Sequence, residues 1–211
     1  MAPGPDLRRQ LIAALARPGD QSTDFDLNPL VPPPSRILRP AAVLVGVMSA
    51  PGGAQLVLTK RASHLLHHPG QIAFPGGKQE ATDACPAAAA LREAHEEVGL
   101  DPALVEVLGM MPSHQTVTGF AVTPVLGWIS AGFVARLEAG EVEEVFTVPL
   151  AHIAEPGNYR IETRIWQGQP RLYHTVPYGP YYIWGATARI LLALAERLSD
   201  GRPAGRRQLA P

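Results

Sequence analysis

A short amphipathic helix with two marked ends is the feature that most constrains the fold of this chain. Pro86 stands at an early helical position, where its missing N–H group removes no hydrogen bond. Gly99 stands where a glycine commonly ends a helix. Four apolar residues share one stripe between these limits: Ala87, Leu91, Ala94 and Val98. The spacing predicts a helix over 86–98 whose apolar stripe packs against a core.

The other side of this predicted helix carries three carboxylates, Glu93, Glu96 and Glu97. At about 100° per residue, Glu93 and Glu97 lie roughly 40° apart, and Glu96 lies about 60° to the other side of Glu93. Like charges at this spacing repel one another, and a bound divalent cation would turn this repulsion into a net attraction. Oxygen-only ligands suit Mg²⁺ or Mn²⁺. A solvated acidic face is the alternative, which Arg92 and a glycine pair upstream disfavour.

These residues resemble the Nudix box, whose pattern is G-x5-E-x7-R-E-U-x-E-E-x-G-U with U a bulky aliphatic residue. The matching residues are Arg92, Glu93, Glu96, Glu97, Gly99 and Leu100. Asp83 stands where the family has Glu, the loop from there to Arg92 is one residue longer, and Ala94 is smaller than usual. By this resemblance the main metal ligands are Glu93 and Glu97, Glu96 assists, and Arg92 forms an orienting salt bridge. Arg92, Glu93 and Glu96 are therefore candidate catalytic residues.

A second resemblance lies upstream of the helix. Residues 58–61 and 68–77 look like the signature that precedes the box in coenzyme A pyrophosphatases, and 117–125 and 182–187 also look like that subfamily. The resemblance thus runs from about residue 40 to about 195. It implies hydrolysis of the diphosphate of coenzyme A or its thioesters. The products would be 3′-phosphoadenosine 5′-phosphate and 4′-phosphopantetheine or its acylated form.

Candidate contacts to the substrate phosphates lie in the same upstream segment. Lys60 and Arg61 are the obvious cationic partners, although a strand end at the surface often carries such charges without a ligand. Leu66 and His67 occupy positions where the signature would have a basic residue. The corresponding contact is therefore missing, or it comes from His67, His68 or Lys60.

The pair Gly76 and Gly77 adds a further candidate contact. A tight turn there would expose backbone N–H groups that can approach a phosphate or support the metal-bearing helix closely. A Gly-Gly pair alone is weak evidence. Its place six residues before Asp83 and fifteen before Arg92 makes it stronger.

Diphosphate hydrolysis also needs a group that removes a proton from the attacking water. Metal ions can neutralise charge and place the water, while the proton acceptor is a carboxylate within hydrogen-bond reach. In this family either a helix glutamate or an acid from a later loop serves. Glu143 and Glu144 are the later candidates, and Glu144 is favoured because a strand ending at 148–150 follows it. An ordinary solvated acidic loop is the alternative for this pair.

Composition limits the partners of the chain. A formal net charge of −1 provides no global basic field for nucleic acid, and no run of 18 apolar residues could span a membrane. Cys85 is the only cysteine, which excludes an internal disulfide and fits a reducing cytosol. We expect a cytoplasmic protein with a small-molecule substrate, coenzyme A or acyl-CoA. The oligomeric state stays open.

Three parts are expected: an N-terminal helix with a proline-rich extension over 1–39, a Nudix hydrolase domain over 40–198, and a flexible tail over 199–211. Helices are expected over 5–17, 86–98 and 184–198. Strands are expected over 42–48, 55–60, 71–74, 104–110, 120–129 and 144–148, with a hairpin at 159–166 and 171–176. This order indicates an α+β fold, an α/β/α sandwich with a mixed sheet, which agrees with the Nudix fold.

Two other functions compete with coenzyme A hydrolysis. One is a Nudix hydrolase that acts on another nucleoside diphosphate derivative, such as ADP-ribose, NADH or a dinucleoside polyphosphate. The other is a ligand-binding Nudix domain without catalysis. Loss of a helix glutamate would be the signature of that last class, and none is lost here.

Overall fold

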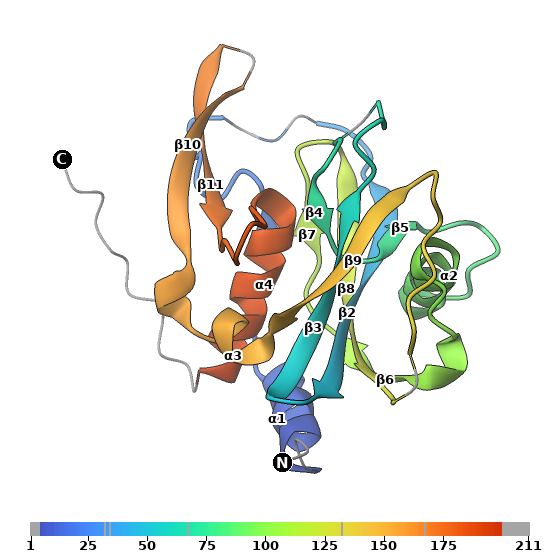
Figure 1. Cartoon of the computed structure of the whole chain (residues 1–211). Helices are drawn as coiled ribbons and strands as arrows, with labels where there is room; N and C mark the ends of the chain where they lie inside the picture. The colour runs from blue at the N-terminus through green and yellow to red at the C-terminus, as the bar shows by residue number, and fades with distance from the viewer. Residues whose placement is uncertain are drawn as a thin grey trace.

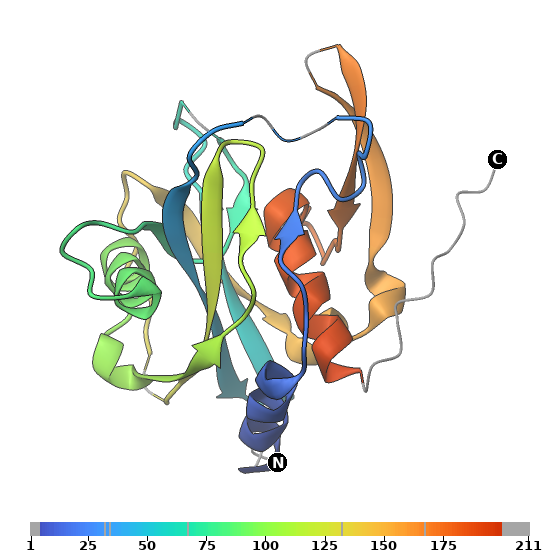
Figure 2. The same ribbon diagram turned by 180° about the vertical axis from the view of Figure 1, so that it is seen from behind.

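The computed structural model describes residues 5–31, 33, 35–66, 68–131, 133–166 and 168–199. A mixed β-sheet lies at the centre, and helices cover both of its faces (Figure 1). Helix α2 (Pro86–Val98) lies on one face, while α1 (Pro5–Ala16), α3 (Leu150–Ile153) and α4 (Gly185–Leu198) lie on the other. Figure 2 shows the same layers from behind. The predicted α/β/α sandwich is therefore confirmed.

The strands of the central sheet follow the order β1-β7-β8-β2-β3-β4, with β5 beside β2, β6 beside β8 and β9 beside β3. Their bounds are β1 Ser22–Thr23, β2 Arg39–Ala50, β3 Gly53–Arg61, β4 Ile72–Ala73, β5 Gly76–Lys78, β6 Val105–Met110, β7 His114–Gln115, β8 Phe120–Ile129 and β9 Val142–Pro149. The long strands β2 and β8 run parallel, whereas β3 is antiparallel to both β2 and β9. Of these strands, β2 and β5 pack most extensively against α2.

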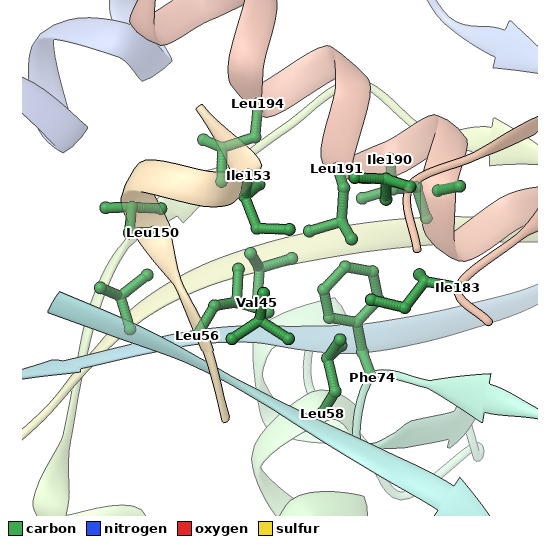
Figure 3. Close-up of a cluster of buried hydrophobic side chains, with 14 of the residues drawn as sticks. Val45, Leu56, Leu58, Phe74, Leu150, Ile153, Ile183, Ile190, Leu191 and Leu194 are labelled. Carbon is green, nitrogen blue, oxygen red and sulfur yellow. The ribbon is translucent and has the colours of Figure 1, made fainter. Parts of the chain in front are cut away.

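Two hydrophobic cores lie on the two faces of the sheet because successive strand residues point to opposite sides. On β2, Ala42 and Leu44 face α2, whereas Val45 and Val47 face α4. Figure 3 shows Val45 and residues of β3 packed beneath Ile190, Leu191 and Leu194 of α4. On the α2 side, the small residues Ala90 and Ala94 are fully buried, so that the helix approaches the sheet closely. Of the apolar stripe predicted for this helix, Ala94 and Val98 are fully buried, whereas Ala87 and Leu91 are only partly buried against the same core.

A separate two-stranded sheet, β10 (Arg160–Trp166) and β11 (Gln169–Thr175), forms the predicted hairpin and stands on the α4 side of the molecule (Figure 1). Short 3₁₀ turns, η1 (Pro102–Leu104) and η2 (Pro156–Asn158), precede β6 and β10. The expected tail from residue 200 lies outside the described residues. Within the described part of the chain, no helix is long and apolar enough to cross a membrane.

Several local expectations need correction. Gly76 and Gly77 do not form a tight turn: they begin strand β5, which pairs antiparallel with Ala41–Val43 of β2 because β2 starts earlier than its apolar run suggests. Strands β1 and β7 and helix α3 were not predicted, since each has only two to four residues and too short a pattern.

Candidate active site

Helix α2 is held at both ends in the way that its sequence predicts. Gly99 adopts a left-handed conformation (φ 68°, ψ 23°), and its N–H group bonds to the carbonyls of Ala94 and His95. Glycine reaches this conformation without steric cost, so the helix stops here. Along its length α2 packs against β2 and β5. The acids of the helix therefore meet the chain that runs from β4 to β5.

Glu97 is the buried acid of this helix, with only 5% of its surface exposed. Its carboxylate accepts a hydrogen bond of 3.0 Å from the backbone N–H group of Gly76. Burial raises the pKa of Glu97 to about 7, the Gly76 hydrogen bond opposes this rise, and the charge of Glu93 adds to it. A carboxylate in this environment favours a compensating positive charge.

Glu93 lies over the adjoining residue of β5. A Cβ atom placed on Gly77 would lie 2.5 Å from the carboxyl carbon of Glu93, so no larger residue fits without displacing this acid. Gly76 is equally constrained, because its φ is 153° and a Cβ atom would lie 2.5 Å from the carbonyl oxygen of Ala42. Burial is the main cause of a raised pKa at Glu93, and Arg92 partly offsets it. Gly77 thus makes room for Glu93, and Gly76 allows β5 to lie close to β2.

Arg92 connects the helix to the preceding loop. Its Nε and Nη2 atoms donate hydrogen bonds of 3.1 and 2.9 Å to the carboxylate of Asp83, and Nη2 also donates to the Lys78 carbonyl. Its Nη1 atom donates to Glu93 at 3.1 Å and to Glu96 at 3.0 Å. The Asp83 carboxylate is 5% exposed, and Arg92 holds its pKa below the ordinary value. Asp83, a departure from the box, is therefore the main partner of Arg92.

Glu96 occupies a different environment from the other two acids. Its side chain is 57% exposed and forms an i,i+4 salt bridge with Arg92 on the outer side of the helix. Glu93 and Glu97 instead face β5. Among the described residues, no group of three or more His, Cys, Asp or Glu side chains is arranged so that it could hold a metal ion. One buried acid (Glu97), one partly buried acid (Glu93) and one exposed acid (Glu96) thus replace the even stripe that helical geometry alone suggests.

The donor chemistry at Glu93 and Glu97 nevertheless fits a hard divalent cation. Both groups supply carboxylate oxygens, which Mg²⁺ and Mn²⁺ prefer. Glu141 places a further negative charge near both acids and raises the pKa of each, after the larger effect of burial. Arg61 is close enough to lower the pKa of Glu97, but this effect is smaller than that of burial. A cation bound here would offset negative charge that Arg92 and the Gly76 N–H group compensate only in part.

Lys60 and Glu143 pair with each other at the end of β3. Lys60 Nζ donates a hydrogen bond of 2.7 Å to the Glu143 carboxylate, which also accepts from the backbone N–H and the hydroxyl of Ser63. These hydrogen bonds lower the pKa of Glu143 to about 2. A carboxylate with so low a pKa is a weak proton acceptor near neutral pH. The contact weakens Glu143 as a candidate base.

Glu144 has a different partner. It lies on β9 opposite Lys60 of β3, and it accepts a hydrogen bond from the hydroxyl of Tyr181. The Tyr181 ring stacks on Phe146, with 3.6 Å between ring centroids, and this fixes the direction of the hydroxyl. Sequence reasoning missed Tyr181, although it directly precedes 182–187, one of the segments that look like the coenzyme A pyrophosphatases. The pair gives Glu144 a defined position.

The remaining candidates lie in the loop between β3 and β4. The Arg61 N–H group donates to the Gln71 carbonyl at 3.0 Å, and the Arg61 carbonyl accepts from Gly70 at 3.2 Å, so the loop closes on itself. Leu66 is 95% exposed at its tip. His67 lies outside the described residues, and its predicted contact with substrate stays a prediction.

The NUDIX domain family model matches residues 38–161 of the chain. The chain belongs to the Nudix hydrolases. The uncharacterized Nudix hydrolase NudL of Salmonella paratyphi B is 46% identical over 157 residues, which are 74% of this chain and 81% of that protein. The NudL protein of Salmonella newport gives the same values.

A Nudix hydrolase from M. smegmatis, RenU, is among the solved structures that resemble the chain. Its TM-score is 0.48 with 26% sequence identity, covering 56% of this chain and 75% of that one. As a Nudix hydrolase, the protein is an enzyme that acts on diphosphate bonds. Members of the family generally use divalent metals such as Mg²⁺ or Mn²⁺.

Proposed function

We propose that this Nudix hydrolase is a metal-dependent coenzyme A diphosphatase. It would hydrolyse coenzyme A or its thioesters to 3′-phosphoadenosine 5′-phosphate and 4′-phosphopantetheine or its acylated form. One contact carries this proposal. Residues 68–77, which resemble the coenzyme A pyrophosphatase signature, lie directly against the box helix, where the Gly76 N–H group bonds to Glu97.

Glu93 and Glu97 are the proposed principal metal ligands, and Glu96 assists from the exposed side. When bound, Mg²⁺ or Mn²⁺ would neutralise charge on the diphosphate and lower the pKa of a water molecule. The residues of the chain hold the metal-binding carboxylates in place. Arg92 holds Glu93 and Glu96 through Nη1 while the loop at Asp83 holds Arg92. Gly77 keeps the backbone close to the partly buried Glu93, and the Gly76 N–H group bonds to the buried Glu97.

Glu144 is the proposed proton acceptor for the attacking water. The Tyr181 hydroxyl fixes one oxygen of this carboxylate by hydrogen bonding. Glu143 is the weaker candidate because its carboxylate is occupied by Lys60 and Ser63. Arg61, which lies near Glu97, is the better placed cation for a substrate phosphate, since Lys60 is already paired.

The test is incubation with coenzyme A and either Mg²⁺ or Mn²⁺, followed by chromatographic separation and mass identification of the products. The proposal expects adenosine 3′,5′-bisphosphate and 4′-phosphopantetheine in equal amounts. ADP-ribose, NADH and a dinucleoside polyphosphate serve as competing substrates. Good turnover of one of these, with none of coenzyme A, would overturn the substrate and leave the enzyme class intact.

A further inference from the structure

A cavity lies on the α4 side of the sheet, away from helix α2. It has a volume of about 200 Å³, and four segments that are distant in sequence form most of its wall. These are 23–27 near β1, 116–118 beyond β7, the hairpin β10–β11, and the first turn of α4. Figures 1 and 2 show the hairpin and the start of α4 side by side. None of the residues placed above at the metal or the water belongs to its wall.

Aromatic side chains form one part of this wall. Trp184 precedes the first residue of α4, and Tyr173 meets it edge to face with 5.4 Å between ring centroids. Trp166, at the outer end of β10, also lines the cavity and is 40% exposed. Large exposed aromatic side chains around a cavity provide faces on which a flat ring can stack.

Arginines form the other part. Arg164 lies over the Trp184 ring at 5.5 Å from its centroid. Arg189 Nε forms an ion pair of 3.9 Å with Asp26. The buried Nη1 atom of Arg189 has no hydrogen-bond partner among the described residues and lies 3.9 Å from a carboxylate oxygen of Glu196. An unsatisfied buried donor on a cation is costly and favours an anionic acceptor. Arg171 is the third guanidinium in the wall.

The acids of the wall are already engaged. Asp24 accepts hydrogen bonds from the backbone N–H of Val117 at 2.7 Å and contacts His114 Nε2 at 3.1 Å. Asp26 accepts from the backbone and hydroxyl of Thr23. Three arginines against two aspartates leave the lining with a formal excess of one positive charge. The cavity therefore combines stacking surfaces with a lining of net positive formal charge, which favours an anion.

The cavity is connected to the acids of α2 through one short segment. His68 and Gln71 belong to its rim, and the Gln71 carbonyl accepts the hydrogen bond from the Arg61 N–H group. Arg61 in turn lies near Glu97. An extended substrate could place its diphosphate at the acids and one end across this segment in the cavity.

We infer that this cavity binds the purine-nucleotide end of the substrate, with the base stacked at Trp184 and Trp166 and a phosphate held by Arg164 and Arg189. The assignment rests on the proposed function, under which this end is the 3′-phosphoadenosine moiety of coenzyme A. The pantetheine arm then leaves the diphosphate in the other direction. The cavity thus determines which half of the substrate is recognised.

Isothermal titration calorimetry with adenosine 3′,5′-bisphosphate in EDTA tests the cavity without the metal. The wild type should bind. Arg164→Gln and Trp184→Leu should each weaken binding by about tenfold, because each removes a charged or stacking contact. Arg160→Gln is the matched control: Arg160 is exposed on the same strand β10 but does not line the cavity. The Arg160→Gln variant should bind adenosine 3′,5′-bisphosphate with the same affinity as the wild type.

The steady-state kinetics of coenzyme A hydrolysis separate the two proposals. Arg164→Gln should raise KM by about tenfold with kcat unchanged, as expected for lost binding away from the reacting bond. If coenzyme A is not cleaved but the nucleotide binds and the two variants weaken it, the substrate proposal fails and the cavity assignment stands. Coenzyme A turnover with no nucleotide binding, or with equal affinity in all three variants, overturns the cavity assignment alone.

Discussion

Arg92 donates two hydrogen bonds to the carboxylate of Asp83, which lies nine residues earlier in the chain. Asp83 is held for this contact by a turn, in which its N–H group bonds to the Glu80 carbonyl and the Glu80 N–H group bonds to its carboxylate. A shorter side chain on a loop that is one residue longer therefore still reaches the arginine. The departure from the Nudix box keeps the salt bridge that orients the acids.

Replacing Asp83 should disturb catalysis through this contact. In Asp83→Asn the amide retains the shape but loses the charge that holds Arg92, and we expect kcat to fall about 10- to 100-fold, as for other outer-shell partners of a metal site. Asp83→Glu restores the charge and should recover part of the loss. Steady-state kinetics at saturating Mn²⁺ provide the measurement. Equal activity of Asp83→Asn and the wild type would remove Asp83 from the site.

Glu97 and Glu96 should differ sharply in importance. Glu97→Gln keeps an acceptor for the Gly76 N–H group and removes a buried charge, so the metal-free protein should unfold at the same or a higher urea concentration. Turnover should fall by more than about 100-fold, beyond the usual effect of outer-shell changes. Glu96→Gln, at an exposed position, should lose less turnover than Glu97→Gln. Retained turnover in Glu97→Gln would contradict the assigned metal ligand.

The two acids of β9 provide a test of the proton acceptor. Glu144→Gln should lower kcat about 10²- to 10⁴-fold, the usual contribution of general base catalysis. Glu143→Gln should change kcat only a few-fold, because that carboxylate is already paired with Lys60. Parallel pH–rate profiles of the two variants check the difference. The opposite order of effects would exchange the roles of Glu143 and Glu144.

His174 should make the stability of the fold depend on pH. Burial, assisted by Arg189 and His114 and opposed by Asp26, lowers the pKa of His174 to about 4. Below its ordinary pKa of about 6.5 the unfolded chain binds a proton that the folded chain does not, so stability falls as the pH drops from about 6.5 to about 4. Above about pH 6.5 the imidazole is neutral in both the folded and the unfolded chain, so its titration no longer lowers the stability.

Urea unfolding at pH 7.5 and pH 5.0 measures this contribution. The wild type should lose on the order of 1 kcal/mol more than His174→Gln between these conditions, a value reduced for the partial exposure of the ring. A wild type and variant with identical pH dependence would show that His174 is protonated in the folded protein. The comparison cancels titration of the other groups.

His114 should anchor the N-terminal segment to the sheet. It is fully buried, with Ser22 Oγ 2.9 Å from Nδ1 and Asp24 3.1 Å from Nε2. In His114→Leu the largely buried Asp24 keeps the hydrogen bond from Val117 but loses its contact with the imidazole, and we expect the free energy of unfolding to fall by about 2–4 kcal/mol. The control is His64→Gln at an exposed position, which should stay within about 0.5 kcal/mol of the wild type. Equal stability of both variants would show that His114 does not anchor the N-terminal segment.

The sequence predicted the elements whose signals are local. Pro86, Gly99 and the apolar stripe define α2 within a few residues, because each signal depends on neighbours within one or two turns. The hairpin β10–β11 and helix α4 were also located from periodicity. Strand β5 was not, since Gly76 and Gly77 have no strand pattern and become a strand only where β2 offers its edge.

The residues of the candidate site also fall into a group that the sequence predicted and a group that it did not. Residue types and spacing identified Arg92 and the three acids as a group, and the structure brings Arg92, Glu93 and Glu97 to the start of β5. The pairing of Lys60 with Glu143 and of Glu144 with Tyr181 was not predictable, because those partners come from strands and loops far apart in sequence.

The sequence by itself determined that one helix face carries apolar residues and the other carries acids, because helical geometry alone distributes them. It could not distinguish Glu97 from Glu96, which are adjacent and chemically identical. Only the tertiary structure decided that Glu97 is buried against the Gly76 N–H group while Glu96 remains in solvent. Burial depends on which backbone packs over the helix, and that backbone is β5, held in place by the sheet.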